Sequence, residues 1–177
     1  MIEQRQHALR LAVWIVIASE ALLFAGLFAL YASYRAEYPQ AFHAGVARDL
    51  KTVGSINTMI LLTSSFAMAW AILRARQGAR PRFALAAVLV LGSAFLALKL
   101  VEWGIHIEDG ITPHSGLFFT LYYFMTGLHA AHVIAGLALV AWVTARPRLE
   151  TMELVGVYWH FVDLVWVFLW PMFYLLP

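Results

Sequence analysis

The chain has 177 residues, of which 63% are hydrophobic and only 12% are charged, with a formal net charge of +2 and no cysteine. A soluble domain is usually about one quarter charged, so this composition excludes an ordinary water-soluble fold and indicates a membrane protein. The absence of cysteine excludes disulfides and thiolate metal sites. The basic residues sit in short clusters beside apolar runs, which argues against a nucleic-acid partner.

Five apolar segments are each long enough to cross a bilayer, which requires about 20 residues of helix. The predicted spans cover residues 11–33, 55–73, 83–105, 116–143 and 155–176. The four connections each hold one proline, and these are Pro39, Pro81, Pro113 and Pro147. Pro171 lies inside the last span and is expected to bend it. The sequence predicts an all-α integral membrane protein, with residues 1–177 forming one domain of five transmembrane helices.

Basic residues are unevenly divided between the two ends of the predicted bundle. One end holds Arg5, Arg10, Arg74, Arg76, Arg80, Arg82, Arg146 and Arg148, and the other holds Arg35, Arg48 and Lys51. Since cytoplasmic loops are enriched in Lys and Arg, this distribution predicts a cytoplasmic N-terminus and a periplasmic C-terminus.

Small residues recur at every fourth position in two of the spans. The rows are Ala21, Ala25 and Ala29 in the first span and Gly127, Ala131 and Ala135 in the fourth. Such rows let helix backbones approach closely, and they predict a compact bundle. The alternative is that alanine is simply common in membrane helices.

Several ionisable side chains are expected between the inner end of the bundle and its midplane. They are Glu20, His129, His132, His160 and Asp163. Each costs about 2.5–3.5 kcal/mol or more inside a bilayer, so each needs a partner. Residues three apart share a helical face, which pairs His129 with His132 and His160 with Asp163. The pattern predicts a buried polar network that forms hydrogen bonds across helices.

A second polar group lies near the outer end of the third span, where Lys99, Glu102 and His106 share one helical face. We interpret Lys99 and Glu102 as an intrahelical pair whose head groups reach toward the membrane interface. The second span carries polar residues that we interpret as helix-packing groups, namely Asn57, Thr58, Ser64 and Ser65.

These residues leave more than one function open. His132 and His160 could ligate a haem, or could bind a metal together with Glu20 and Asp163. Alternatively, the chain could be a proton-conducting protein in which Glu20 relays the proton. Structural hydrogen bonding is the competing interpretation. Under that interpretation, the chain contributes no catalytic residue and no metal ligand.

Five sequence strings, read in order, resemble subunit III of the haem-copper oxidase superfamily along the whole chain. They are WIVIASEALLF at 14–24, SINTMILLTSS at 55–65, KLVEW at 99–103, FFTLYYFMTGLHAAHV at 118–133 and YWHFVDLVW at 158–166. The resemblance implies a polar interior whose residues have no catalytic role. These residues are Glu20, Glu102, His129, His132, His160 and Asp163.

The resemblance implies the short, five-helix form of subunit III, located in the bacterial cytoplasmic (inner) membrane. Such a subunit is non-catalytic and holds no cofactor, because haem with copper or non-haem iron belongs to the catalytic subunit. It supports assembly, stability and sustained proton uptake. The implied partners are therefore the haem-bearing subunit and membrane phospholipid.

Local departures indicate a subgroup within this family. Ala130 replaces the Gly of a common His-Gly-x-His string, and Lys99 stands where oxidase subunits often have Gln. With the Tyr122-Tyr123 pair, these features resemble the subunit-III-like protein associated with nitric oxide reductase. A subunit of a cytochrome c or quinol oxidase is the alternative.

Overall fold

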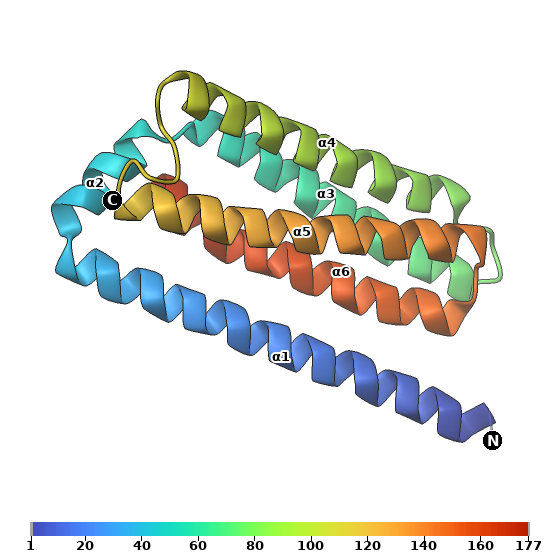
Figure 1. The fold of residues 1–177 in the computed structure, drawn as a ribbon. Coiled ribbons are helices and arrows are strands. Elements are labelled where there is room, and N and C mark those ends of the chain that lie inside the picture. The colour runs from blue at the N-terminus through green and yellow to red at the C-terminus, as the bar shows by residue number, and fades with distance from the viewer. Residues whose placement is uncertain (1, 177) are drawn as a thin grey trace.

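The computed structural model describes residues 2–176, apart from the side chains of residues 2–6 and 9, so the side chain of Arg5 lies outside the described part. The described residues form six α-helices and one π-helix. These are α1 (Ile2–Glu37), α2 (Pro39–Arg48), α3 (Lys51–Arg76), α4 (Arg82–Glu108), α5 (Leu117–Ala145), α6 (Leu149–Trp170) and η1 (Pro171–Leu175). In Figure 1 the long helices α1, α3, α4, α5 and α6 run along one axis.

Within residues 2–176, five helical segments are long and apolar enough to cross a membrane, which confirms the predicted number of spans. They cover Arg10–Glu37, Lys51–Arg76, Arg82–Glu108, Leu117–Ala145 and Leu149–Leu175. The short helix α2 was not predicted, because the sequence analysis treated this segment only as a connection. Pro39 occupies its first turn, where the missing N–H is not needed, and Phe42 and Val46 are buried.

Helices α3 to α6 form the bundle, whereas α1 runs beside α5 and α6 at its edge (Figure 1). The small residues Ala21, Ala25, Ala29, Ala131 and Ala135 are exposed and Gly127 is half-buried. The prediction that these rows draw the helices of this chain together is therefore wrong. Tertiary packing turns both rows toward the outside of the chain.

The close approach within the bundle depends on a tryptophan and two glycines outside those rows. Trp159 of α6 is fully buried. A Cβ at Gly92 of α4 would lie 2.9 Å from the indole ring, and one at Gly136 of α5 would lie 2.8 Å from it. Both glycines therefore leave the space that Trp159 fills, and they let three helices meet.

Pro171 changes the helix type at the end of α6. From Pro171 onward the chain forms the π-helix η1, and the Leu176 N–H donates to the Pro171 carbonyl at 2.8 Å. Proline has no N–H for an α-helical bond, which explains why the regular pattern stops here. The π-helix buries Phe173 and Tyr174 in the bundle.

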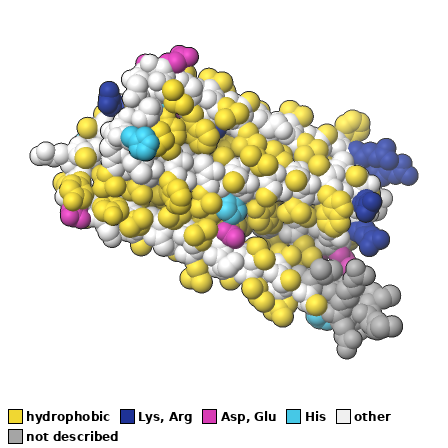
Figure 2. All heavy atoms as spheres, viewed as in Figure 1, with side chains coloured by type: hydrophobic (Ala, Val, Ile, Leu, Met, Phe, Trp, Pro, Cys, Tyr) yellow, Lys and Arg dark blue, Asp and Glu magenta, His cyan; other side chains and the backbone are white. Residues whose placement is uncertain are grey.

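The outer surface suits a bilayer, with hydrophobic side chains over most of the face in Figure 2 and Lys and Arg gathered mainly at one end. The N-terminus lies at one end of the long helices and the C-terminus at the other (Figure 1). Which of these ends faces the cytoplasm stays a prediction of the arginine distribution.

Candidate functional site

The most concentrated polar group in the described structure surrounds a buried ion pair on α4. Lys99 Nζ lies 3.2 Å from Glu102 Oε2, and both side chains are almost completely buried. The spacing of three residues puts the two side chains on one face of the helix. A charge pair sealed from water needs further hydrogen bonds, because its desolvation is costly.

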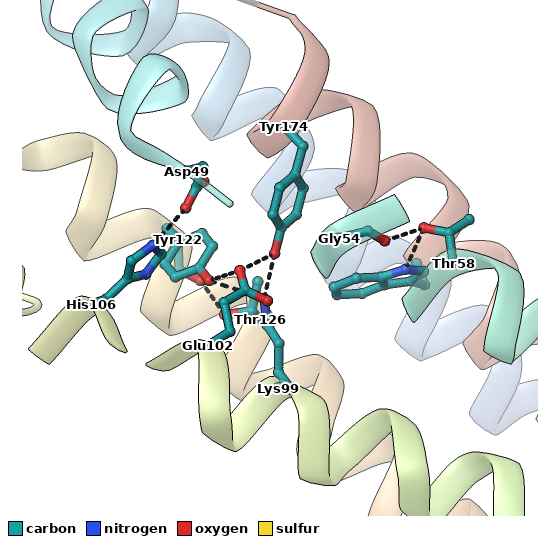
Figure 3. Close-up of polar contacts among 10 residues, drawn as sticks. Asp49, Gly54, Thr58, Lys99, Glu102, His106, Tyr122, Thr126 and Tyr174 are labelled. Atoms are coloured by element: carbon teal, nitrogen blue, oxygen red, sulfur yellow. Dashed lines mark hydrogen bonds and ion pairs between the residues drawn. The ribbon is translucent and has the colours of Figure 1, made fainter. Parts of the chain in front are cut away.

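Two tyrosines supply those hydrogen bonds, as Figure 3 shows. Lys99 Nζ donates to the hydroxyl of Tyr122 on α5 at 3.0 Å and to that of Tyr174 on η1 at 2.6 Å. Tyr122 and Tyr174 in turn donate to Glu102 Oε1 at 2.6 and 2.5 Å. Each hydroxyl thus accepts from the ammonium and donates to the carboxylate, so the cluster joins three elements.

The interpretation that Lys99 reaches the membrane interface is therefore wrong. Its ammonium turns into the bundle, and its nitrogen lies 4.7 Å from the centre of the Tyr122 ring and 5.2 Å from that of Trp166. Aromatic faces attract a cation, and this attraction is stronger away from water. Partners on other elements stabilise the buried lysine, and spacing along one helix does not reveal them.

Asp49 and His106 extend this cluster toward α2 (Figure 3). Asp49 follows the last residue of α2, and its Oδ1 lies 3.3 Å from His106 Nε2 in the last turn of α4. Both residues are buried. Burial raises the pKa of the Asp49 carboxyl to about 8, against the opposing effect of the Lys99 charge. Asp49 was missed in the sequence because it lies in a connection.

The polar residues of α3 have separate roles. Trp166 donates its indole N–H to Thr58 Oγ1 at 3.0 Å, and Thr58 donates to the Gly54 carbonyl at 2.8 Å. Asn57 and Ser64 are fully buried, and their side chains make no hydrogen bond to any described residue. Thr58 therefore links α3 to α6 within the bundle.

The five residues predicted as one interior network do not form one. Glu20 Oε2 lies 3.0 Å from His132 Nε2 and joins α1 to α5, and its side chain is 26% exposed. Ser65 Oγ lies 2.6 Å from His160 Nδ1 and joins α3 to α6. Two separate hydrogen bonds therefore take the place of the predicted network. They share no helix, because one joins α1 to α5 and the other joins α3 to α6.

His129 and Asp163 are the remaining two members of that set. His129 is buried against the rings of Phe95 and Trp166, at 5.7 and 5.2 Å between ring centres, with no hydrogen bond in the described part of the chain. Asp163 is buried beside Ser65, the partner of His160, although its oxygens make no hydrogen bond of ordinary geometry within residues 2–176. Neither side chain is directly bonded to the Glu20–His132 pair.

This geometry does not favour haem ligation by His132 and His160. His132 Nδ1 lies 2.8 Å from the Leu128 carbonyl, and its Nε2 lies against Glu20. Both ring nitrogens are thus engaged, whereas an axial ligand needs one of them free for the iron. One nitrogen of the His160 ring, Nδ1, is likewise engaged in a hydrogen bond with Ser65.

The fold and site define a class: a polytopic membrane protein with five spans and a buried, hydrogen-bonded ion pair inside its helical bundle. Comparison with known proteins narrows the class. The family model described as cytochrome c oxidase subunit III matches residues 3–176. The chain belongs to this family, the subunit III family of haem-copper oxidases.

Several relatives agree with this assignment. Cytochrome c oxidase subunit 3 of Synechocystis is 33% identical over 93% of this chain and 74% of its own length. The same-named protein of Thermostichus vulcanus is 31% identical over 94% and 86%. Heme-copper oxidase subunit I+III of Aeropyrum pernix is 30% identical over 94% of this chain, which spans 22% of that longer protein.

Proposed function

We propose that the chain is a non-catalytic accessory subunit of a respiratory haem-copper complex in the bacterial cytoplasmic membrane. It packs against the haem-bearing catalytic subunit and supports that subunit's assembly, stability and proton uptake. The observation that carries this proposal is the closed cluster of Lys99, Glu102, Tyr122 and Tyr174, in which every polar head group has a partner inside the chain. Such a cluster locks a scaffold and offers no open position for a substrate.

The exposed rows of small residues support a helical partner. Ala21, Ala25 and Ala29 leave a low ridge on α1 that no other part of the described chain covers. Small residues let a neighbouring transmembrane helix approach closely. The Aeropyrum pernix relative carries subunits I and III in one chain by its name, which supports subunit I as the neighbour.

The reported relatives are named as oxidase subunits, and another, from Pseudomonas putida, is named as a cytochrome bo(3) ubiquinol oxidase subunit 3. They favour oxygen as the gas reduced by the complex. The resemblance to the protein associated with nitric oxide reductase stays a prediction, which turnover measured separately on the two gases would decide.

A phospholipid is the second proposed partner. An apolar cleft between α1, α5 and α6 is lined by residues that include Val16, Leu139 and Tyr158. It adjoins a second hollow lined by Arg146 and Arg148, which suit an anionic head group. Mass spectrometry of lipid extracted from the purified chain should find retained anionic phospholipid, and less after Arg146→Gln with Arg148→Gln. Equal retention would contradict this assignment.

The partner proposal is tested by affinity purification of the tagged chain from native membranes in mild detergent. We expect a haem-bearing partner to co-purify and to give a Soret absorbance band. Ala25→Phe should lower its recovery several-fold, because the large ring keeps a neighbouring helix from approaching this row of small residues. The matched control is Val90→Phe on α4, where the side chain is 67% exposed. Recovery of the chain alone, or equal recovery with both variants, would contradict the proposed interface.

A further inference from the structure

Three potential metal ligands meet beside the Lys99 ion pair. One ligand atom each from Asp49, Glu102 and His106 lies within 4.8 Å of the other two, and all three residues are buried. Glu102 and His106 are four residues apart on α4, so they project from consecutive turns of one face. Asp49 arrives from the α2–α3 connection. The group therefore combines imidazole and carboxylate donors from two separate segments.

Two of these side chains have unused hydrogen-bonding capacity. Asp49 is 6% exposed and His106 is 1% exposed. Their closest atoms lie 3.3 Å apart, yet neither carboxylate oxygen of Asp49 and neither ring nitrogen of His106 makes a hydrogen bond to the described residues. Buried polar atoms without partners are costly, so the arrangement calls for another group between them.

The charges indicate the sign of that group. Lys99 is matched by Glu102, so a cation that displaced the proton of the buried Asp49 carboxyl would meet a negative charge that the ammonium does not already balance. In the view of Figure 3, Glu102 lies between Lys99 on one side and the Asp49–His106 pair on the other. A cation beside Asp49 and His106 would thus be separated from the ammonium by the Glu102 carboxylate.

We propose that Asp49, Glu102 and His106 bind a divalent metal ion, with zinc the best match to their donors. Zinc binds imidazole nitrogen and carboxylate oxygen at about 2.0–2.2 Å, which places two tetrahedral ligands about 3.3–3.5 Å apart. The Asp49–His106 separation of 3.3 Å already meets this spacing. Glu102 is the third donor, with one ligand atom within 4.8 Å of those of Asp49 and His106, and the fourth position is left for water.

The ion would act as a structural cross-link in this account. It would tie the connection between α2 and α3 to the C-terminal end of α4, where Asp49 and His106 already lie against each other. This departs from the expectation that no residue of the chain ligates a metal. It is independent of the proposed role as an accessory subunit, because the three ligands belong to this chain alone.

Zinc titration of the full chain, purified in mild detergent and stripped with chelator, tests the site. We expect one tightly bound zinc per chain and a rise in the unfolding temperature on zinc addition. Asp49→Asn and His106→Gln should each weaken zinc binding at least tenfold. The matched control is His114→Gln, because His114 is an exposed histidine in the connection that follows α4. That variant should bind zinc like the wild type.

X-ray absorption of the zinc-loaded wild type adds a readout that does not depend on how well the variants fold. We expect nitrogen and oxygen ligands that include one imidazole. Binding of less than one zinc per chain would overturn the proposal. So would unchanged affinity in both ligand variants, loss of binding in His114→Gln, or a spectrum that requires two or more imidazoles.

Discussion

Glu102→Gln is expected to lower the free energy of unfolding by about 3–5 kcal/mol, the usual cost of breaking a buried ion pair. The amide keeps the shape of the side chain but removes its charge. Lys99 is then left with the hydroxyls of Tyr122 and Tyr174 as its close polar partners. Unfolding of the purified chain by titration with a denaturing detergent, with chelator present, measures this loss.

A second variant separates charge from packing. Lys99→Met combined with Glu102→Gln removes both charges and should recover most of the stability, because no uncompensated charge remains. The control pair is Arg76 and Glu153, which lie 2.8 Å apart at 60% and 30% exposure. Glu153→Gln should cost no more than about 1 kcal/mol. Equal losses for the two single variants would show that the Lys99 pair does not anchor the fold.

Trp159→Ala should produce the second large loss, toward the lower end of about 3–5 kcal/mol. The indole fills the space beside Gly92 and Gly136, so its removal leaves a cavity where α4, α5 and α6 meet. Lipid solvates the separated helices, which reduces the transfer contribution and leaves mainly the lost packing contacts. The same detergent titration measures the effect.

Trp142 provides the matched control for this substitution, since its side chain on α5 is 50% exposed. Trp142→Ala should change the unfolding free energy by less than about 1 kcal/mol, because it opens no internal cavity. If both tryptophan variants lost the same stability, the close packing around Trp159 would not be what joins the three helices.

The helices could be predicted because hydropathy and proline placement act locally. A span of about 20 apolar residues has few alternatives in a bilayer, where every backbone polar group must be bonded internally. Hydropathy did not predict helix α2, because this helix has only ten residues and is not a membrane span.

The site was only partly predictable. Spacing on one helix found Lys99, Glu102 and His106, but it gave the wrong depth for Lys99 because the deciding partners lie on other elements. Tyr174 enters the cluster through the π-helix that follows Pro171, and Asp49 enters through a connection. Neither position belongs to a periodic pattern, so no signal in the sequence pointed to them.

The interior histidines also show that spacing along one helix does not predict contacts between helices. Residues three apart on a helix share a face, but a shared face does not imply a shared partner. His132 bonds Glu20 of α1, whereas His129 packs against Phe95 and Trp166. Helix rotation and the order of neighbours decide these contacts, and both depend on the packing of the whole bundle.

Turnover of the isolated respiratory complex, before and after this chain is removed, tests the central claim most directly. Oxygen and nitric oxide should be supplied separately, with haem absorbance recorded in both preparations. The account predicts that the haem stays with the partner and that initial turnover persists, while activity then decays faster without this chain. Immediate and complete loss of turnover with the haem retained, or haem that departs with this chain, would contradict it.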